Sequence, residues 1–406
     1  MAEPLQPSGT KPSLRLRVTA AAETIVRGGH PWVFAQSVRA LNRPGQTGEL
    51  AVIFDRKDRF LAVGLYDAES PIRVRILRAG KPRGIGPDFW EGRLAEALGR
   101  REGLFDGNTT GYRCIHGESD GWPGLVLDCY GDTRVVKLYT AAWLPWLEEL
   151  APRLARNGRL VLRLSRNIQE TAAARFNVHD GQALRGQPPA GPVEFLEHGL
   201  RFEADVVRGQ KTGFFLDQRE NRRQVRELAD RRDVLNLFSF TGGFSLYAAE
   251  GGAASVCSVD ISARALAGAR RNFALNMERP PVARCRHETI QADVFDWLRQ
   301  PPRQRFGMVV LDPPSLAKKE SERAEAVGAY ARLIEGVLPR LKKDGILAAA
   351  SCSAHVSADE FFNLTLEAAR KSGRRFDTLR TTRHPADHPA AFAEAEYLKC
   401  LYLRFQ

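Results

Sequence analysis

The most informative stretch of the chain is residues 235–244, LNLFSFTGGF. The apolar run Val234–Phe238 predicts a buried strand, and Phe244–Glu250 has the pattern of a helix that starts after two glycines. In open α/β sheets, a strand, a glycine turn and a helix follow one another where the backbone approaches a ligand closely. The stretch therefore predicts the first strand and the ligand-binding turn of an α/β domain.

Strands and helices alternate through the rest of this part of the chain. The further predicted strands are Ser255–Val259, Thr289–Ala292, Gly307–Leu311, Gly345–Ala350 and Tyr397–Phe405. The further predicted helices are Arg222–Leu228, Ala263–Asn276, Ala326–Lys342 and Ala358–Lys371. Apolar strands that alternate with helices indicate a mostly parallel sheet covered on both faces. We therefore expect residues 201–406 to form a Rossmann-like α/β domain.

Two smaller domains are expected before residue 201, which makes the chain a multidomain protein. Residues 1–83 are expected to form a small β-barrel from the β-rich segments Leu14–Val18, Leu50–Phe54, Phe60–Tyr66 and Ile72–Leu77. After the linker Gly80–Pro87, residues 84–200 are expected to form a small central α+β domain. Its predicted elements are the helices Phe89–Phe105 and Trp143–Leu154, a hairpin of Leu125–Cys129 and Arg134–Tyr139, the strand Leu160–Leu164, the loop Gly181–Pro192 and two strands within Val193–Val207.

The net charge of +12 is distributed unevenly along the 406 residues. Residues 1–83 carry +7, residues 84–200 carry −2, and the remainder carries +7. Two basic ends are typical of a protein that binds a polyanion such as nucleic acid. An arginine-rich surface without such a partner has the same charge pattern, so charge alone leaves both interpretations open.

Other features favour an intracellular protein without a metal site. The six cysteines include no C-x-x-C pair, which argues against zinc, and their scatter fits reduced thiols. Met1–Ser13 is polar and lacks the apolar core of a signal peptide. No apolar run approaches the ~18–20 residues that a membrane span needs. We expect a cytoplasmic location and no membrane partner.

Acidic residues follow the next two predicted strands. Asp260 comes directly after Ser255–Val259, where a carboxylate can accept hydrogen bonds from both ribose hydroxyls of an adenosine. Asp293 follows Thr289–Ala292 and is placed to bind the adenine amino group, while Val294 or Phe295 packs on the ring. The Gly-x-Gly-x-x-Gly fingerprint of dinucleotide sites and the Walker loop are both absent.

S-Adenosylmethionine is the cofactor that this pattern favours. It carries no phosphate, so it needs neither of the two missing phosphate-binding motifs. The predicted cofactor residues of this region are Asn236, Phe238, Thr241, Gly242, Asp260, Ile261, Asp293 and Val294.

A carboxylate and two prolines follow the fourth predicted strand. The prolines of Asp312-Pro313-Pro314 stiffen the loop and remove backbone donors, so Asp312 and nearby carbonyls face a planar substrate. Asp/Asn-Pro-Pro at this position is typical of methyltransferases that act on amino groups or bases. Asp312 is therefore a predicted catalytic residue, and Pro313 and Pro314 are predicted substrate contacts.

Cys352 follows the fifth predicted strand, in Ser351-Cys352-Ser353. A single cysteine is more often an inert core residue. Its position beside the Asp312 loop makes a nucleophile the better interpretation. Carbon 5 of a pyrimidine is a poor nucleophile until a thiolate adds to carbon 6, so methylation of carbon 5 requires a cysteine. We therefore predict Cys352 as the catalytic nucleophile.

Several further motifs resemble one family. They are GHPWVF (residues 29–34), SPIRVR (70–75), GESDGWPGL (117–125) and GQKTGFFLDQRENR (209–222). With the motifs above, they are similar to the class I S-adenosylmethionine-dependent 5-methylcytosine methyltransferases of large-subunit ribosomal RNA, the RlmI type. The resemblance covers nearly the whole chain.

The resemblance implies a domain order, a substrate and further site residues. The domains would be an N-terminal PUA domain, a central α+β domain and a Rossmann-like methyltransferase domain, and the substrate would be 23S ribosomal RNA. A homodimer is also implied. Further cofactor contacts would come from Gln210, Lys211, Thr212, Phe215 and Asp217. Other RNA cytosine methyltransferases carry a second cysteine after the proline of the fourth-strand motif, but Ser315 follows Pro314 here, so the base that removes the carbon 5 proton is unassigned.

Two other functions compete with this interpretation. The first is methylation of a base nitrogen in RNA, which would use Asp312-Pro313-Pro314 and no thiol. The second is a non-catalytic RNA-binding factor of ribosome assembly. The intact residues Gly242, Asp260, Asp293 and Asp312 argue against it. The sequence leaves the target nucleotide open, as well as the choice between naked RNA and a ribosomal particle.

Overall fold

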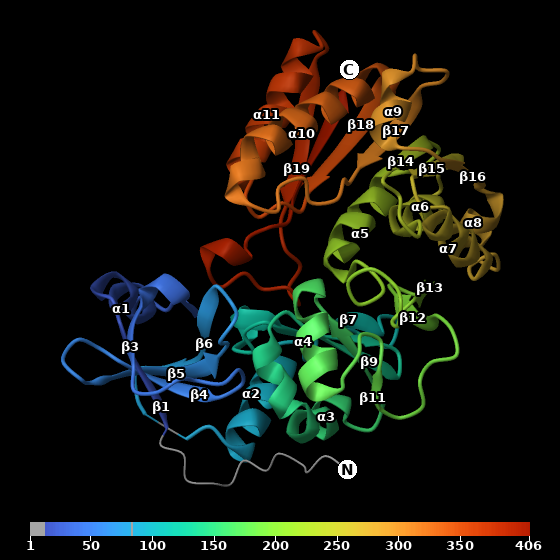
Figure 1. Cartoon of the computed structure of the whole chain (residues 1–406). Helices are drawn as coiled ribbons and strands as arrows, with labels where there is room; N and C mark the ends of the chain where they lie inside the picture. Colours follow the sequence, from blue (N-terminus) through green and yellow to red (C-terminus); the bar gives the residue numbers. More distant parts are fainter. Residues whose placement is uncertain (1–12, 83) are drawn as a thin grey trace. The chain divides into compact units, whose positions relative to one another are not determined.

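The computed structural model describes residues 13–82 and 84–406, and the chain divides into two compact units (Figure 1). Unit 1 comprises the chain up to Glu102 with residues 113–191 and 206–212. Unit 2 comprises residues 103–112, 192–205 and 213–406. Residues 1–12, which include most of the segment examined for a signal peptide, and Arg83 of the predicted linker lie outside the described residues.

The first part of unit 1 is a β-sheet with the strand order β2-β6-β5-β4-β1-β3. Its strands are β1 (Leu14–Val18), β2 (Trp32–Phe34), β3 (Val38–Leu41), β4 (Leu50–Phe54), β5 (Phe60–Tyr66) and β6 (Ile72–Ala79), with helix α1 (Ala20–Arg27). The four predicted strands are confirmed. The helix was not predicted, although Thr19 is its N-cap and accepts a hydrogen bond from the Ala22 amide.

The second part of unit 1 is a sheet with the order β11-β10-β9-β8-β7. Its elements are α2 (Pro87–Gly99), β7 (Gly111–His116), β8 (Leu125–Tyr130), β9 (Thr133–Leu138), α3 (Leu147–Ala155), β10 (Arg159–Leu164), α4 (Arg166–Phe176) and β11 (Ala183–Arg185). Three buried tryptophans, Trp90, Trp122 and Trp143, pack with ring centroids 5.5–5.8 Å apart. The predicted hairpin is confirmed, and the predicted loop Gly181–Pro192 contains the short strand β11.

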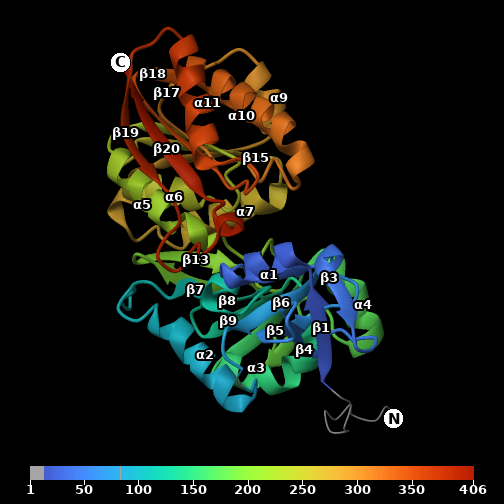
Figure 2. The same cartoon turned by 90° about the vertical axis from the view of Figure 1, so that its left-hand side faces the viewer.

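Unit 2 contains a sheet with the order β16-β15-β14-β17-β18-β20-β19 (Figure 2). Its strands are β14 (Asp233–Leu237), β15 (Ser255–Asp260), β16 (Arg286–Gln291), β17 (Phe306–Leu311), β18 (Leu341–Ser351), β19 (Phe376–Thr382) and β20 (Lys399–Phe405). The five strands from β14 to β18 pair in parallel, and β20 is inserted antiparallel between β18 and β19. The predicted mostly parallel sheet is confirmed.

Helices cover both faces of this sheet (Figures 1 and 2). They are α5 (Arg219–Leu228), α6 (Gly243–Glu250), α7 (Ala263–Ala274), α8 (Pro280–Arg284), α9 (Val294–Arg299), α10 (Arg323–Val337) and α11 (Ala358–Lys371). Helices α5, α6 and α7 pack side by side on one face, and α9, α10 and α11 pack on the other. Apolar side chains of α9, α10 and α11 form one buried core with the strands, including Val294, Tyr330 and Phe361.

One predicted helix of unit 2 was too long. The prediction extended it to Lys342, but α10 ends at Val337, a single 3-10 turn covers Leu338–Arg340, and β18 already begins at Leu341. Pro339 explains the difference, because its ring removes a backbone donor and cannot continue an α-helix.

A hairpin of β12 (Val193–Glu197) and β13 (Leu200–Ala204) also belongs to unit 2. It turns at His198 and Gly199, both of which have positive φ. The amides of β13 are tied to α7, since Asn272 and Asn276 accept hydrogen bonds from Glu203 and Arg201. The domain boundary expected after residue 200 therefore falls inside β13, directly after its first residue, and both strands of the hairpin lie in unit 2.

Candidate active site

The turn after β14 lies at the point in the sheet where the chain reverses its direction of winding. The chain leaves β14 toward β15 and β16 on one side and returns to β17 and β18 on the other. Ligands bind at the carboxyl ends of the strands beside such a point. Phe238 and Phe240 have φ values of 58° and 48°, which cost non-glycine residues energy and often mark ligand sites.

Gly242 is required at the start of α6. Its φ is 74°, and a Cβ at this position would lie 2.8 Å from the Cβ of Ala269. A larger residue would push the turn away from α7, so glycine keeps the first turn of α6 close to its neighbour. The predicted sequence of strand, glycine turn and helix is thus present in the structure.

Asp260 organises this turn from the end of β15. Its Oδ2 accepts a hydrogen bond of 2.8 Å from the Phe240 amide, and its Oδ1 accepts one of 2.9 Å from the Ser262 amide. An ionised carboxylate offers about four acceptor positions, so two stay available for a ligand. The side chain therefore holds the strained turn and can still accept two hydroxyl groups.

Polar atoms buried in the turn point to a ligand with hydrogen-bonding groups. Within the described part of the chain, Asn236 Oδ1, Ser239 Oγ and Thr241 Oγ1 are buried and have no hydrogen-bond partner. Such atoms are rare in folded proteins because each costs free energy. The amide nitrogen of Asn236 donates 2.9 Å to Ser245 Oγ, so Asn236 also joins β14 to α6.

The ends of β15 and β16 supply an apolar surface beside the turn. Ile261 is 66% exposed, which is unusual for a large apolar side chain. Asp293 is exposed and caps α9 by accepting a hydrogen bond of 3.1 Å from the Asp296 amide, while Val294 is buried. Phe238 packs edge-on to Phe295, with ring centroids 6.1 Å apart. The predicted residues at the ends of β14, β15 and β16 therefore lie along the same edge of the sheet.

Asp312 follows β17 at this edge. Its Oδ1 accepts a hydrogen bond of 2.9 Å from Gln218 Nε2. Burial, reinforced by the nearby Asp217 carboxylate, raises the pKa of Asp312 to about 7. Asp217 itself accepts a hydrogen bond of 2.9 Å from the Tyr397 hydroxyl. A carboxyl group with this pKa can both give and accept a proton near neutral pH.

Cys352 follows β18, the parallel neighbour of β17. Its Sγ donates to the carbonyl oxygen of Pro313 across 3.9 Å, so the two predicted catalytic loops are adjacent. All six cysteines lie in the described part of the chain, and the other five are buried while Cys352 is half-buried. Pro313 is buried and Pro314 is exposed.

Ser353 ties the two loops together. Its Oγ accepts a hydrogen bond of 3.0 Å from the Leu316 amide and contacts the Tyr330 hydroxyl at 2.9 Å. The Tyr330 hydroxyl also accepts from Ser351 Oγ. The position of Cys352 relative to Asp312 is therefore fixed by side chains on both sides of the cysteine.

The residues predicted from the stretch 209–222 fall into both units. Phe215 and Asp217 lie in unit 2, where Phe215 packs edge-on to Phe240 with ring centroids 4.9 Å apart. Gln210, Lys211 and Thr212 belong to unit 1, where the Thr212 hydroxyl donates 2.6 Å to Asp128 Oδ2. A cofactor role of these three residues stays a prediction.

Several residues of the site were not predicted. Gln218 lies within the motif of residues 209–222 and directly follows Asp217, so that motif carried a signal for it. Tyr330 lies on α10, Tyr397 lies just before β20, and Lys399 is its first residue, and no local pattern marks them as site residues. They reach the site only through the packing of α10 and the insertion of β20 beside β18.

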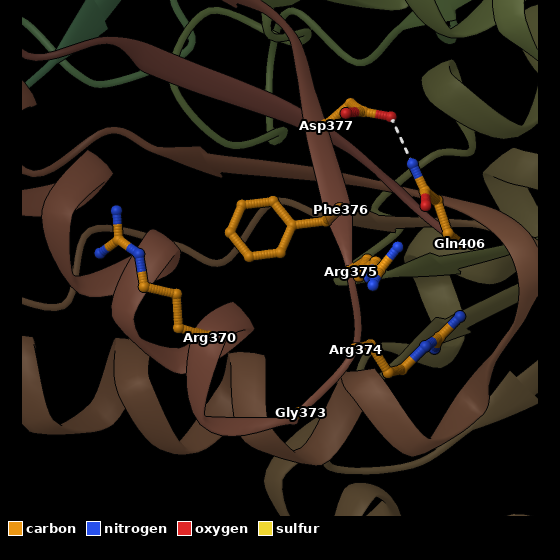
Figure 3. A pocket seen from close by; sticks show the side chains of 7 residues that line it. All are labelled: Arg370, Gly373, Arg374, Arg375, Phe376, Asp377 and Gln406. Atoms are coloured by element: carbon orange, nitrogen blue, oxygen red, sulfur yellow. Dashed lines mark hydrogen bonds between the residues drawn. The ribbon is translucent and has the colours of Figure 1, made fainter.

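A basic cavity lies at the opposite edge of the sheet (Figure 3). It is lined where α11 ends, β19 begins and β20 ends, by Arg370, Gly373, Arg374, Arg375, Phe376, Asp377 and Gln406. Arg374 donates to the carbonyl oxygens of Leu341 and Lys342 at the start of β18. The cavity therefore lies away from the carboxyl ends of the strands, where the predicted site residues gather.

The family of the chain follows from its similarity to known proteins. The model of S-adenosylmethionine-dependent methyltransferases matches residues 161–404, and a PUA-like domain matches residues 16–79. The chain belongs to the S-adenosylmethionine-dependent methyltransferases. The chain thus has an N-terminal PUA-like domain and a C-terminal Rossmann-like methyltransferase domain, as predicted.

Relatives of this methyltransferase match it over nearly their full length. The ribosomal RNA large subunit methyltransferase of Deinococcus radiodurans is 55% identical, over 98% of this chain and 99% of that protein. Ribosomal RNA large subunit methyltransferase I of Shewanella denitrificans is 35% identical, over 97% and 99% of the two chains. A crystal structure of a methyltransferase complexed with SAH has the same fold, with a TM-score of 0.81, 23% identity and coverage of 96% and 99%.

The structure fits the cofactor of the family. S-Adenosylmethionine carries ribose hydroxyls, an amino group and a carboxylate, which match the buried unpartnered polar atoms of residues 236–241 and the free acceptor positions of Asp260. The exposed Ile261 offers an apolar face to its adenine. In the described residues, no helix is both long and apolar enough to cross a membrane, and no group of acidic, His and Cys side chains is placed to hold a metal.

Proposed function

We propose that the chain methylates carbon 5 of a cytosine in large-subunit (23S) ribosomal RNA, with Cys352 as the covalent nucleophile. The RNA substrate is supported by the full-length relatives from Deinococcus and Shewanella, which are ribosomal RNA large subunit methyltransferases. The cytosine chemistry is supported by Cys352, the one cysteine of the described chain that is not buried. It lies beside the Pro313 carbonyl at the carboxyl edge of the sheet.

We assign the cofactor to the strand ends of unit 2. Asp260 would bind the ribose hydroxyls, Ile261 and Val294 would pack on the adenine, and Asp293 would bind its amino group. Thr241, Gly242 and the backbone of the turn would face the amino acid part, with Asn236 and Phe238 supporting the turn and Phe215 and Asp217 on its other side. The bound cofactor supplies a methyl group on a positively charged sulfur, which is open to attack by a nucleophilic carbon.

The protein residues would activate the cytosine in two linked steps. The Cys352 thiolate forms a bond to carbon 6 of the base, and the electron pair of the 5,6 double bond moves toward nitrogen 3. Asp312, with a pKa of about 7, donates a proton to that nitrogen, so no negative charge accumulates on the ring. Pro313 and Pro314 keep the cytosine ring in position. Carbon 5 then carries enough electron density to accept the methyl group.

The second half of the reaction releases the product. A base takes the proton from carbon 5, the electrons of that bond restore the 5,6 double bond, and the Cys352–carbon 6 bond breaks. Nitrogen 3 returns its proton to Asp312, and the base releases the carbon 5 proton to solvent, so the enzyme ends in its starting state. The base at carbon 5 is not assigned.

A fluorinated substrate tests the covalent step. We expect the full-length protein with S-adenosylmethionine to form an adduct with RNA that contains 5-fluorocytosine, because the fluorine cannot leave as a proton. The adduct should survive denaturing electrophoresis. It should be absent in Cys352→Ala and present in Cys285→Ala, which removes a buried thiol outside the site.

The same experiment separates the competing functions. Methylation by Cys352→Ala near the wild-type rate would contradict the covalent mechanism and favour methylation of a base nitrogen through Asp312. If S-adenosylmethionine also failed to raise the melting temperature of the protein, the non-catalytic RNA-binding factor would be favoured. A homodimer stays a prediction from the resemblance.

A further inference from the structure

Lys399 is a buried lysine beside the candidate nucleophile. It is the first residue of β20 and pairs with Ser351 of β18 in the antiparallel register. Only 2% of its surface is exposed. Buried lysines are rare unless a partner compensates the loss of hydration. The partners of its ammonium group therefore indicate its role.

Three backbone carbonyls receive the protons of this ammonium group. Lys399 Nζ donates to the carbonyl oxygens of Ser353 and Val356, both at 2.5 Å, and to that of Tyr397 at 3.0 Å. Two of these carbonyls belong to the loop that carries Cys352. Lys399 is thus hydrogen-bonded to the residue directly after the cysteine.

The charge of Lys399 has no ionised carboxylate as a partner in the described chain. The Glu360 carboxylate acts on Lys399 through its charge, but it forms an ion pair of 3.0 Å with Arg323. Burial lowers the pKa of Lys399 to about 8, while a charge on Cys352 acts to raise it. Because the attraction between two charges is mutual, the ammonium group favours the ionised thiol as much as the thiolate favours the ammonium.

We propose that Lys399 is a positioning residue of the reaction, which fixes the Cys352 loop through its carbonyls and stabilises the thiolate with its charge. The inference rests on the proposed function, because only covalent catalysis requires a thiolate at this position. The thiol proton leaves to solvent, the electron pair stays on sulfur for the bond to carbon 6, and Lys399 keeps its three protons throughout.

Other groups around the pair define the electrostatic setting. An ionised Asp312 disfavours a negative charge on the Cys352 sulfur. Because the pKa of Asp312 is raised to about 7, much of this carboxyl group is neutral near pH 7, and the neutral form does not oppose the thiolate. Burial raises the pKa of Tyr330 to about 12, so this phenol stays neutral. Further charged or titratable neighbours are Glu360 on α11, Arg383 after β19, and His355 of the same loop, which contacts Glu320. His384 also lies near Lys399, and burial lowers its pKa to about 4, so this imidazole stays neutral near pH 7.

The reactivity of Cys352 toward an alkylating reagent tests the inference without RNA or cofactor. Iodoacetamide reacts with thiolates, and the five buried cysteines make Cys352 the reactive site, with Cys352→Ala as the baseline. The rate measured against pH in the full-length protein should be half-maximal clearly below the ~8.5 of an ordinary thiol. A wild-type midpoint at or above that value would overturn the inference whatever the variants do.

The variant Lys399→Gln separates the effect of the Lys399 charge from the effect of its hydrogen bonds. Lys399→Gln keeps a donor for the carbonyls but removes the charge, so the midpoint should rise by about one pH unit or more. Lys343→Gln, which removes an exposed charge at the other end of β18, should leave it unchanged. A Lys399→Gln protein that melts at a lower temperature but has the wild-type midpoint would show a merely structural lysine and overturn the proposal.

The alkylation experiment distinguishes a failure of this inference from a failure of the proposed function. A low midpoint in the wild type that rises in Lys399→Gln supports the pairing of thiolate and ammonium even if no 5-fluorocytosine adduct forms. In that case the proposed function is contradicted, but the pairing of Lys399 with the Cys352 thiolate is not. An adduct that forms with unchanged rate in Lys399→Gln, at an unchanged midpoint, overturns the role of Lys399 and leaves the proposed function intact.

Discussion

Asp260 combines two tasks that a single carboxylate can perform at once. It accepts the amides of Phe240 and Ser262, and this fixes the backbone of the turn with its unusual positive φ values. Its remaining acceptor positions face the edge of the sheet where the cofactor residues gather. In the proposed site, the residue therefore links the shape of the turn to the binding of ribose.

Replacement of Asp260 should weaken cofactor binding strongly. We expect Asp260→Ala to raise the Kd for S-adenosylmethionine more than tenfold, because hydrogen bonds to a charged group contribute about 1.5–3 kcal/mol each. Isothermal titration calorimetry on the full-length protein measures the effect. Asp296→Ala, on the exposed side of α9, is the matched control. An unchanged Kd in Asp260→Ala would remove the residue from the cofactor site.

Asp312 should make the stability of the protein depend on pH. Its pKa is about 7 in the folded protein and 3.8 in the ordinary state, so folding takes up a proton between these values. The folded state then binds more protons than the unfolded state, and stability contributed by this group decreases as pH rises from about 4 to about 7.

The variant Asp312→Asn removes this titration. Its free energy of unfolding relative to wild type should increase between pH 4 and pH 7 by more than about 1 kcal/mol, while methylation falls. Urea unfolding at several pH values, with Asp344→Asn as an exposed control, gives the comparison. A constant difference across this range would show that Asp312 has an ordinary pKa.

At the scale of the elements, strands were predicted well where burial was complete. The strand β17 is buried along its whole length, so its sequence is a continuous apolar run. The strand β19 (Phe376–Thr382) was missed because it lies at the edge of the sheet and is largely exposed, which leaves a polar sequence, FDTLRTT. The strand β19 has no buried residue, so it lacks the apolar pattern on which sequence interpretation depends.

The candidate site likewise contains residues that the local sequence predicts and residues that it does not. Asp260, Asp312 and Cys352 each follow a parallel strand, and parallel strands end at one edge, so their proximity was predictable. Lys399 was not predictable, because β20 runs antiparallel and its first residue, not its last, reaches that edge. Tyr397 lies close to the start of the same strand and escaped prediction for the same reason.

At the scale of the whole molecule, the PUA-like domain offers basic side chains for a polyanion. Arg15 and Arg17 of β1 are exposed and line a surface hollow with Leu41, Asn42 and Phe54. The Arg15 guanidinium lies 5.9 Å from the centre of the Phe54 ring. A cation next to an aromatic ring is a common arrangement at RNA-binding surfaces.

The double variant Arg15→Ala/Arg17→Ala should weaken RNA binding while S-adenosylmethionine binding persists. The slope of log K against log salt is negative, and each lost phosphate contact reduces its magnitude by roughly 0.7–0.9, so the magnitude should fall by about one to two. Fluorescence anisotropy with a ribosomal RNA fragment at several salt concentrations measures it. Arg231→Ala, an exposed arginine of unit 2, serves as the control. If both variants had the same slope as the wild type, the RNA-binding surface would lie elsewhere on the protein.

The insertion of β20 between β18 and β19 has a consequence for the order of folding. The outer edge of β18 has no neighbour until a segment some fifty positions later in the sequence arrives, and β19 has nothing to dock on before that moment. During refolding, an apolar strand with open backbone donors and acceptors is thus available to other chains, which is the usual route to aggregation. The strand β20, which completes the edge of the candidate site, therefore also protects the folding sheet from pairing with other chains.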